Sequence, residues 1–486
     1  MKLRQAASLM GVKADELAAE LFDNEIADFS IDSRSTKPGE LFFALSQKDY
    51  ERAGFNGTFA DGHQYVPAAF ARGALAAVVR TDHLNATDLQ PFRDRLLAVD
   101  DAIAALQAFA RRVYESWARP VVGITGSAGK TTAKELTAHL LQSNGRRVLK
   151  SERNYNNGLG LPLTILRMIS AGNSPAAFDV AVLEMGMSSP THEIRRLVQI
   201  TPPDIGVELM VAPVHLEHLG TIENIAAAKA ELIEGLKPGG TAVLNADDPL
   251  VISMRAKHSG RTMTFGIENA ADVSASEIET SRLGLIRFRL HTPLGDAPAE
   301  LPMSGRHNLM NALAAAAVAT SFDIPPATIA KALRTVKPPK MRGEVLEFAA
   351  GFTVIDDSYN SNPRSLLSMV QTIAEVGIRK RRRFVIAGEM LELGTDERRL
   401  HRETGRAIAA AGIEVLWGIR GLAQKILEGA REGGLQQTRF FDSSEEAAAA
   451  IIAEVKADDL LLIKGSRGVE TDKVVKTLRQ HFPLAE

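Results

Sequence analysis

The stretch VVGITGSAGKTT, residues 121–132, decides how the rest of the chain is interpreted. A β-branched run, Val121–Thr125, leads into a glycine-rich loop, and the helical pattern Ala133–Gln142 follows it. Such a loop presents backbone N–H groups and a helix N-terminus to phosphate oxygens. Lys130 would neutralise charge on the β- and γ-phosphates, and the Thr131 hydroxyl would reach Mg²⁺. We therefore expect this loop to bind a nucleotide.

The loop departs from the strict pattern G-x4-G-K-[ST]. The first glycine of that pattern would fall at Ile124, but Gly123 and Gly126 flank this position and leave a compact G-x-x-G-K-T-T loop. The order of strand, loop and helix, together with the Lys-Thr-Thr triplet, favours phosphate binding over a chance glycine-rich turn. The loop alone does not separate a kinase, an ATPase and a ligase.

Strands and helices alternate outward from this loop. Apolar runs bounded by turn residues predict strands at Asp179–Met185, Asp204–Ala212, Thr241–Asn245, Phe352–Asp356, Arg383–Ala387, Glu414–Gly418 and Leu460–Ile463. Helices are predicted between them, such as Glu445–Lys456, where Ser443 and Glu446 are spaced as a capping box. This alternation predicts an α/β fold with parallel sheets covered by helices.

Three domains are predicted. The 486 residues suggest this number at about 150 residues per domain. Residues 1–117 contain short apolar runs and many turn residues, which predict only a mixture of α and β. Residues 118–338 hold the glycine-rich loop and end in the linker KPPK, residues 337–340. Residues 339–486 then resume the alternation.

The composition excludes several classes of function. The formal net charge of -2 gives no field that would attract nucleic acid or an anionic membrane, and the basic run Arg379–Arg383 is interpreted as a solvated turn. The absence of cysteine leaves His, Asp and Glu as metal ligands. The N-terminus lacks the apolar core of a signal peptide, and no apolar stretch of about 18 residues predicts a membrane span. We expect a cytoplasmic monomer.

Three further residues are candidate metal ligands. Glu184 ends a predicted strand, where a carboxylate would face a nucleotide crevice. His215 lies in APVHLEHLG, and Lys229 lies between Ile225 and Ile233 on the apolar face of the predicted helix Glu223–Ile233. On the residues alone, an exposed loop carboxylate, a structural histidine and a lysine that reaches to water remain open for them.

The compact loop resembles that of the Mur ligases, which build the peptidoglycan stem peptide, and that of the related folylpolyglutamate synthetases. The resemblance implies a UDP-anchoring N-terminal domain, a central P-loop ATPase and a C-terminal Rossmann-like domain that closes over them. It also implies a Mg²⁺ site formed by Thr131, Glu184, His215 and a carbamylated Lys229, and catalytic roles for these last three and Lys130. One departure is Met210, which stands where the family usually carries Asn.

The same resemblance assigns ATP contacts. It implies binding of ATP by Gly126, Ser127, Ala128, Gly129, Lys130, Thr131, Thr132, Asn245, Arg306, His307 and Asn308. On physical grounds alone, the Asn and Asp residues near position 245 and the start of GRHNLMNALAAAA are equally compatible with turns and helix caps.

Other stretches resemble the substrate sites of the family. VIDDSYNSNPRSL (354–366) resembles the DDSYNANP signature of the members that add D-alanyl-D-alanine, and GEMLELG and KGSRG agree with it. DSRSTKPGELFFAL (32–45) resembles the UDP-binding start, DGH (61–63) matches too, and SERNYNNGLGLPLT (151–164) resembles the substrate loop. The implied substrate contacts are Ser33, Arg34, Asn156, Asn157, Asp357, Tyr359, Asn360, Asn362, Lys464 and Arg467. Asn362 and Pro363 also fit the start of a helix.

The resemblance implies an ATP-dependent ligase that activates a carboxylate as an acyl phosphate. Its substrates would be UDP-N-acetylmuramoyl-tripeptide and D-alanyl-D-alanine. Two alternatives are a folylpolyglutamate-type ligase, which the DSRSTKPGELFFAL segment disfavours, and a P-loop ATPase or binding module that uses hydrolysis as a switch. The Glu184, His215 and Lys229 set and the third domain disfavour the second alternative.

Overall fold

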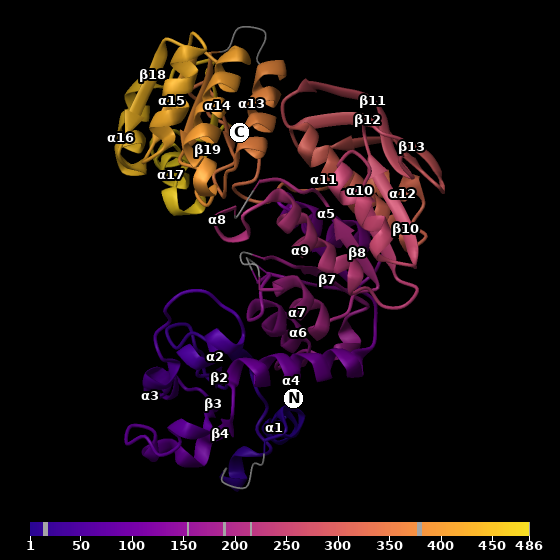
Figure 1. Cartoon of the computed structure of the whole chain (residues 1–486), viewed down its shortest axis with the longest axis vertical. Coiled ribbons are helices and arrows are strands. Elements are labelled where there is room, and N and C mark those ends of the chain that lie inside the picture. Colours follow the sequence, from indigo (N-terminus) through magenta and orange to yellow (C-terminus); the bar gives the residue numbers. More distant parts are fainter. Residues whose placement is uncertain (13–17, 153–154, 188–190, 214–215, 377–381, 486) are drawn as a thin grey trace.

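The computed structural model describes residues 1–12, 18–152, 155–187, 191–213, 216–376 and 382–485. Three α/β units follow one another from the indigo N-terminal end to the yellow C-terminal end (Figure 1). Their sheets occupy residues 29–99, 121–301 and 344–464. The α/β class is therefore confirmed, and we propose that the units are domains with the expected boundaries 1–117, 118–338 and 339–486.

The N-terminal unit is built on a parallel four-stranded sheet whose strands follow in chain order. Its elements are α1 (Leu3–Met10), β1 (Phe29–Ser30), β2 (Leu41–Phe43), α2 (Gln47–Arg52), the 3₁₀ helix η2 (Gly62–Tyr65), α3 (Val66–Ala71), β3 (Ala76–Arg80), β4 (Leu96–Val99) and α4 (Ala102–Trp117). Asp101 caps α4 by accepting from the N–H of Ala104 at 2.9 Å. The buried face of α4 joins a core that the N-terminal unit shares with the central sheet.

The central unit contains a nine-stranded sheet in the order β13-β12-β11-β10-β9-β8-β5-β7-β6. Strands β5 to β11 are parallel, and β12 and β13 add antiparallel pairs at one edge. The strands are β5 (Val121–Thr125), β6 (Val148–Lys150), β7 (Val180–Glu184), β8 (Ile205–Glu208), β9 (Thr241–Asn245), β10 (Arg261–Gly266), β11 (Val273–Arg282), β12 (Leu285–Thr292) and β13 (Gly295–Leu301). The bounds predicted for the strands Val121–Thr125 and Thr241–Asn245 are confirmed.

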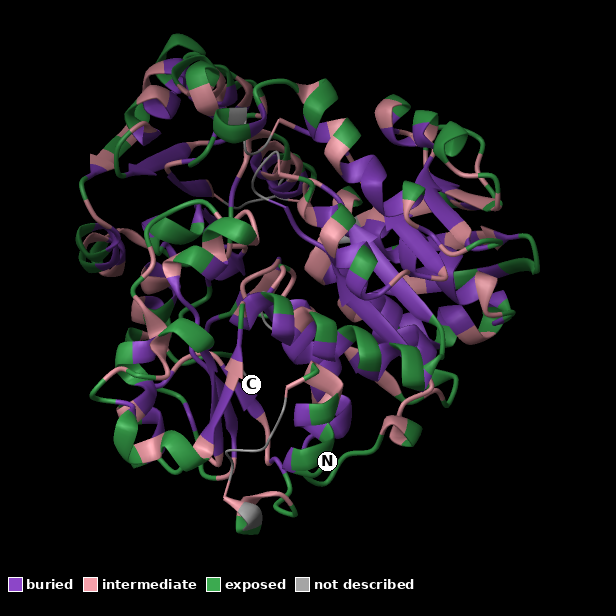
Figure 2. Ribbon diagram, turned by 60° about the horizontal axis from the view of Figure 1, so that its bottom comes forward, coloured by how far each residue is buried: buried purple, intermediate pink, exposed green. Residues whose placement is uncertain are grey.

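Helices cover both faces of the parallel part of this sheet. They are α5 (Lys130–Ser143), α6 (Gly160–Leu166), α7 (Glu193–Ile200), α8 (Leu216–Leu219), α9 (Ile222–Glu234), α10 (Pro249–Ser253), α11 (Arg306–Ser321) and α12 (Pro326–Leu333). Helices α5, α11 and α12 pack on one face around Ile124, and α4, α6, α7 and α9 pack on the other around Leu183. Figure 2 shows the strands in purple, while the helices turn exposed green surfaces outward.

One strand prediction was too long. The strand expected at Asp204–Ala212 ends at Glu208, and the chain then turns over the phosphate loop. The N–H of Ser127 donates to the carbonyl of Met210 at 2.8 Å, and the Ser127 hydroxyl donates to the carbonyl of Ala212 at 3.1 Å. These carbonyls bond to the loop instead of a neighbouring strand, and an apolar run in the sequence does not show where strand pairing stops.

The C-terminal unit has a six-stranded sheet in the order β14-β15-β19-β16-β17-β18, with β14 antiparallel at one edge. Its elements are β14 (Glu344–Glu347), β15 (Thr353–Asp356), α13 (Pro363–Val376), β16 (Arg383–Gly388), α14 (Glu397–Ala410), β17 (Val415–Ile419), α15 (Ala423–Glu432), β18 (Gln437–Phe441), α16 (Ser444–Glu454), β19 (Leu460–Lys464) and α17 (Asp472–His481). Helix α13 lies beside β11 at the junction with the central unit (Figure 1). Across the described ranges, no helix is long and apolar enough to cross a membrane.

Candidate active site

The phosphate loop, residues 126–132, joins the carboxyl end of β5 in the central sheet to the first turn of α5. Gly126 and Gly129 have φ angles of 151° and 84°. A β-carbon at Gly126 would lie 2.9 Å from Leu209, and one at Gly129 would collide with Asn311. Both positions therefore require glycine, which explains the spacing of the compact loop.

Lys130 begins α5 and lines a cavity of about 340 Å³ together with Ser127, Ala128, Gly129, Thr131 and Thr132. Its ammonium donates to the carbonyl of Gly126 at 2.7 Å. Burial lowers the pKa of Lys130, and the nearby charge of Glu184 opposes this shift. The loop thus aims a cation and a helix N-terminus at one cavity, as a phosphate site requires.

Glu184 ends β7, as predicted, and both of its carboxylate oxygens are engaged in the same cavity. The Thr131 hydroxyl donates to Oε2 at 2.9 Å, and the Asn156 amide donates to Oε1 at 2.9 Å. A hydroxyl and a carboxylate in contact are hard oxygen donors of the kind that Mg²⁺ prefers, so the residues present fit this ion. Asn157, beside Asn156, instead accepts from the N–H of Gly160 at 2.9 Å and fixes the start of α6.

Lys134 is a buried residue that sequence reasoning missed. Its ammonium donates to the carbonyl of Ser151 at 2.6 Å, and the Ser151 hydroxyl accepts from the N–H of Glu184 at 3.1 Å. Through Ser151, these two hydrogen bonds connect α5 and β7 to the loop that carries Asn156. The pattern GKTTAKE signals only a helix, because a lysine within a helix is usually solvated.

Lys229 lies on the buried face of α9 together with Ile225 and Ile233, as the helical spacing predicted. Its side chain is 2% exposed, so it does not reach to water. Burial lowers the pKa of Lys229 to about 7, and the charge of Glu208 opposes this shift. A neutral amine is therefore accessible near neutral pH, which carbamylation requires.

Glu208 was not selected from the sequence. It ends β8, is fully buried, and neither of its carboxylate oxygens has a hydrogen-bond partner. Burial raises the pKa of Glu208 to about 8, and the charges of Lys229 and Lys130 oppose the shift. It lies inside the predicted strand Asp204–Ala212, among the apolar residues of GVELMVA, where nothing marked it for a chemical role.

His215 lies outside the described residues. Met210 is described, and its side chain lines a second cavity, also of about 340 Å³. Leu209, Phe265, Ile267 and Met310 give this cavity a largely apolar wall, which suits a flat nucleobase. Asn245 lies on the wall with its amide donating to the carbonyl of Leu209 at 2.8 Å.

His307, in the first turn of α11, lines both cavities. His307 Nδ1 lies 3.0 Å from the Ser368 hydroxyl of α13, and burial lowers the pKa of His307 to about 4. Arg306 lines the apolar cavity and pairs with Glu268. Asn308 lines the first cavity but its amide donates to the carbonyl of Ser304 at 2.8 Å, so it also closes the turn before α11.

The C-terminal unit forms the opposite wall of the first cavity, through Asp357, Tyr359, Asn360, Ser361, Asn362 and Lys464. Lys464 is buried, donating to Asp357 at 2.6 Å and to the carbonyl of Asn360 at 2.8 Å. The predicted start of α13 is confirmed: Pro363 is its first residue, and Asn362 Oδ1 accepts from the N–H of Ser365 at 2.9 Å. The loop between β15 and α13 is thereby fixed towards the phosphate loop.

Arg342 lines the first cavity and was not selected from the sequence. Its guanidinium carbon lies 4.1 Å from the centre of the Tyr359 ring, and its charge acts on Lys130. Within the described ranges, no carboxylate pairs with it, and it lines the first cavity. An unpaired guanidinium beside Lys130 provides a second cation for phosphate. No motif marked it, since it follows the irregular linker.

Three predicted substrate residues do not line this cavity. Arg467 donates to Asp472 at 3.3 Å, and its guanidinium carbon lies 6.0 Å from the centre of the Tyr359 ring. Ser33 is buried in the N-terminal unit. Arg34 extends into solvent from the same unit, and Asp32 accepts from it at 2.9 and 2.8 Å. Ser33 and Arg34 therefore lie in the N-terminal unit, away from the first cavity.

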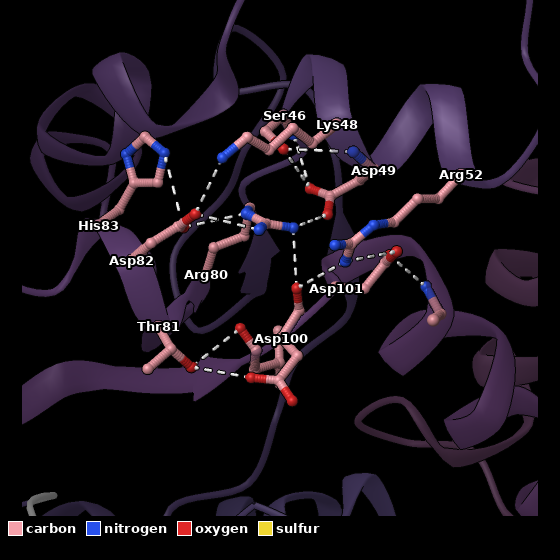
Figure 3. A network of polar contacts seen from close by, with 12 residues as sticks. Ser46, Lys48, Asp49, Arg52, Arg80, Thr81, Asp82, His83, Asp100 and Asp101 are labelled. Atoms are coloured by element: carbon pink, nitrogen blue, oxygen red, sulfur yellow. Dashed lines mark hydrogen bonds and ion pairs between the residues drawn. The ribbon is translucent and has the colours of Figure 1, made fainter.

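The DGH motif, residues 61–63, is hydrogen-bonded to the carboxyl end of β3 in the N-terminal sheet. Asp61 caps η2, and His63 Nδ1 lies 2.6 Å from Asp61. His63 Nε2 accepts from the N–H of Arg80 at 2.9 Å. Figure 3 shows Arg80 between Asp49 and Asp82; its Nη1 donates to Asp49 at 2.8 Å.

The fold and the site define a P-loop enzyme in which a phosphate loop and a second α/β domain share one cavity. Two family models match the chain: Mur ligase middle domain over residues 124–319, and Mur ligase, glutamate ligase domain over residues 341–467. UDP-N-acetylmuramoyl-tripeptide--D-alanyl-D-alanine ligase of Bacillus subtilis (strain 168) is 32% identical over 449 residues, which cover 92% of each chain. The chain therefore belongs to the Mur ligase family and is an ATP-dependent ligase.

Solved structures agree with this assignment. The chain is similar to MurF from Acinetobacter baumannii, with a TM-score of 0.83, 27% identity and coverage of 99% of this chain and 98% of that one. It is also similar to MurF ligase from Thermotoga maritima in complex with ADP, with a TM-score of 0.78, 27% identity and coverage of 94% and 98%. ATP and Mg²⁺ are the expected cosubstrate and ion.

Proposed function

We propose that this enzyme joins D-alanyl-D-alanine to UDP-N-acetylmuramoyl-tripeptide, with release of ADP and phosphate, as a monomer in the cytoplasm. One observation carries the proposal. Lys130 of the phosphate loop and the Asp357–Asn362 loop of the C-terminal unit line the same cavity. A nucleotide and an acceptor amine can therefore meet there. The names of the relatives supply the identity of the two substrates.

The chemistry follows from the poor reactivity of a carboxylate. Attack by an amine would require expulsion of an oxide-like leaving group. Transfer of the γ-phosphoryl group of ATP to the carboxylate oxygen gives an acyl phosphate, whose phosphate is a good leaving group. The amine of D-alanyl-D-alanine then adds to the acyl carbon, and the tetrahedral intermediate expels phosphate. Positioning and charge stabilisation supply most of the catalysis.

Lys130 and Arg342 are the cations that we assign to the phosphoryl group. Both line the cavity, and the Arg342 guanidinium is held against the Tyr359 ring at 4.1 Å. Charge spreads over the phosphoryl oxygens during transfer, so two fixed cations stabilise this state more than the starting state. The backbone N–H groups of residues 128–131 would hold the remaining phosphates.

We assign Mg²⁺ to Thr131 and Glu184, with His215 and a carbamylated Lys229 completing the set that the resemblance implies. When bound, the ion screens the negative charge of the phosphates. The Thr131–Glu184 contact of 2.9 Å supports this assignment, because it places two hard oxygen donors beside the phosphate loop.

The substrate ends are assigned to different units. We propose that Ser33 and Arg34 contact the uridine diphosphate on the N-terminal unit, since Arg34 keeps an exposed guanidinium there. Asn156 and Asn157 would lie along the peptide between that unit and the cavity. Asp357, Tyr359, Asn360 and Asn362, fixed by Lys464, would hold the acceptor, with Arg467 near its carboxylate.

A folylpolyglutamate-type ligase is the second candidate. Folylpolyglutamate synthase of Mycobacterium tuberculosis complexed with ADP shares the fold, with a TM-score of 0.61 at 16% identity over 77% of this chain. The experiment is to incubate the enzyme with ATP and Mg²⁺ and to measure ADP with either substrate alone and with both. We expect ADP release only with both UDP-muramoyl peptide and D-alanyl-D-alanine, and a product whose mass is their sum minus one water. Release with a folate and glutamate, or with ATP alone, would contradict the proposal.

A further inference from the structure

Arg364 is a cation that the C-terminal unit contributes to the apolar cavity. It lies in the first turn of α13, directly after Pro363, and lines the cavity whose wall includes Phe265 and Met310. It does not line the first cavity, whereas its neighbour Ser365 lines both. The first turn of α13 therefore reaches the boundary between the two cavities, with Arg364 on the apolar side.

The guanidinium of Arg364 is held only loosely by the protein. Its side chain is 58% exposed, and its Nη1 lies 3.9 Å from Asp248 Oδ2, which is too long for a hydrogen bond. Asp248 already accepts from the N–H groups of Val211 at 2.9 Å and of Leu250 at 3.0 Å, so its hydrogen bonds do not depend on Arg364. Over the described ranges, Arg364 makes no hydrogen bond, and its donors remain available to a ligand.

The other charged side chains of this cavity are engaged within the central unit. Asp247 accepts from the N–H of Ile267 at 2.8 Å, and Arg306 pairs with Glu268. Among the described residues that line the apolar cavity, Arg364 is thus the charged one without a hydrogen bond. An arginine in this state at the wall of a cavity is a candidate ligand contact.

One face of α13 is packed against the start of α11 in the central unit. The Ser368 hydroxyl lies 3.0 Å from His307 Nδ1, and a β-carbon at Gly305 would lie 3.1 Å from the Thr372 hydroxyl. Positions 364, 368 and 372 follow at i, i+4 and i+8, so they share this face of the helix. The helix that carries Arg364 is therefore held at the cavity by contacts that do not involve Arg364 itself.

A planar guanidinium suits the nucleoside part of a nucleotide, because it stacks on flat rings and donates from several nitrogens at once. We propose that Arg364 binds the nucleoside of the adenine nucleotide, so that the C-terminal unit completes a site whose apolar wall belongs to the central unit. Lys130 and Arg342 line the first cavity and act at the phosphate end. The inference goes beyond the proposed reaction, since it does not depend on the acceptor or on the UDP-linked substrate.

The first test measures nucleotide affinity in the full-length protein with Mg²⁺ and no other substrate. Arg364→Met removes the guanidinium and keeps an unbranched side chain. The Kd for ADP, measured by isothermal titration calorimetry, should rise at least about fivefold. Inorganic tripolyphosphate should displace ADP from the phosphate loop at an unchanged Kd of its own, because it carries no nucleoside. An unchanged Kd for ADP, or an equal loss of affinity for both ligands, would overturn the proposal.

Arg334 offers a matched control for this measurement. Its Nε lies 3.8 Å from Glu300 Oε2, its side chain is 55% exposed, and it lines neither cavity. Arg334→Met should leave the Kd for ADP unchanged. Each substitution should change the unfolding constant of the apo protein by less than about fivefold, because both pairs are exposed. A similar loss of ADP affinity in both variants would show a general effect of charge and would contradict the proposal.

The second test separates the planar guanidinium from its charge. Arg364→Lys keeps a cation but lacks the planar fork, so its Kd for ADP should stay at least about threefold above the wild-type value. In turnover, the KM for ATP should rise in the Met and Lys variants while the KM for the second substrate stays the same. A Lys variant that binds ADP as tightly as the wild type would refute a nucleoside contact. Because ADP binding is measured without acceptor, a failure of the proposed reaction would not affect this result.

Discussion

At the scale of single residues, Lys130 is the side chain that most directly tests nucleotide binding. It begins α5, and its ammonium donates to the Gly126 carbonyl, a partner that carries no formal charge. Lys130→Ala should abolish ADP release, while the circular dichroism spectrum and melting temperature stay near those of the wild type. Normal turnover by a folded Lys130→Ala protein would refute the phosphate role.

Lys229 is predicted to act as a carbamate. Burial lowers its pKa to about 7, which makes the neutral amine that reacts with CO₂ common near neutral pH. Lys229→Ala should lose most activity and regain part of it with added short-chain carboxylates that fill the vacated space. Lys229→Arg should keep a positive charge at this position but stay inactive, because a guanidinium does not carbamylate.

The intact mass of the protein, measured in bicarbonate buffer, tests whether Lys229 is carbamylated. An added mass of one CO₂ on the wild type, absent from Lys229→Arg, is expected. Full activity of the Lys229→Arg variant, together with an unmodified mass of the wild-type protein, would contradict the carbamate prediction.

His307 makes the stability depend on pH. Its folded pKa of about 4 lies below the unfolded value of about 6.5, so the unfolded chain binds the extra proton first. The stability contributed by His307 is therefore complete above pH 6.5 and falls as the pH drops towards 4, by about 1 to 3 kcal/mol. His307→Gln should show a shallower loss of stability over this range in denaturant titrations. Parallel curves for the two proteins would show that the ring is not buried in solution.

The positions of site residues inside a recognisable motif could be predicted from the sequence, and those of site residues outside a motif could not. Glycine-rich loops have a strict order, so the position of Lys130 followed from the sequence, and Asn362 followed from helix-capping rules. Glu208 and Arg342 are single charged residues in an apolar strand end and an irregular linker. Only the three-dimensional arrangement shows that Glu208 is fully buried and that Arg342 lines the cavity.

At the scale of secondary-structure elements, most interior parallel strands were predicted, whereas the parallel strands β6, β10 and β18 and the antiparallel edge of the central sheet were not. Strands such as β5 and β9 are buried on both faces and therefore read as apolar runs. Strands β11 to β13 carry many Ser, Glu and Arg residues, and β12 is buried only at alternate positions over much of its length. An alternating pattern with many charges is weak evidence for a strand, so this edge emerged only from the structure.

Arg80 is predicted to hold the carboxyl edge of the N-terminal sheet together (Figure 3). It donates to the fully buried Asp49 at 2.8 Å and to the carbonyl of Asp100 at 2.8 Å. Arg80→Met should lower the free energy of unfolding by about 3 to 5 kcal/mol, because it leaves the buried Asp49 carboxylate without its counter-charge, with Ser46 still donating to the other oxygen. The measurement is chemical denaturation of the purified full-length variant.

Arg34 provides the control for Arg80. It also pairs with an aspartate, Asp32, but its side chain is 87% exposed. Arg34→Met should change the free energy of unfolding by less than about 1 kcal/mol. If both variants lose the same stability, burial is not what gives the Arg80 network its effect.

At the scale of the whole molecule, the central and C-terminal units share the cavity that is the candidate active site, and the N-terminal unit holds the separate residues predicted to bind substrate. The sequence predicted three α/β regions because Pro-rich and turn-rich segments interrupt the alternation. It did not show that the loop between β15 and α13 faces the phosphate loop, since contacts between distant segments leave no local pattern. The proposed reaction depends on that juxtaposition.

The choice of acceptor most directly tests the central claim, which is that the enzyme joins D-alanyl-D-alanine to UDP-N-acetylmuramoyl-tripeptide. Purified enzyme is given ATP, Mg²⁺ and UDP-N-acetylmuramoyl-tripeptide, and phosphate release is measured with D-alanyl-D-alanine, L-alanine or D-glutamate as acceptor. We expect D-alanyl-D-alanine to support turnover and the single amino acids to give no more than the background without acceptor. If a single amino acid proves the best acceptor, the interpretation of the DDSYNSNP loop and of the cavity that it lines is wrong.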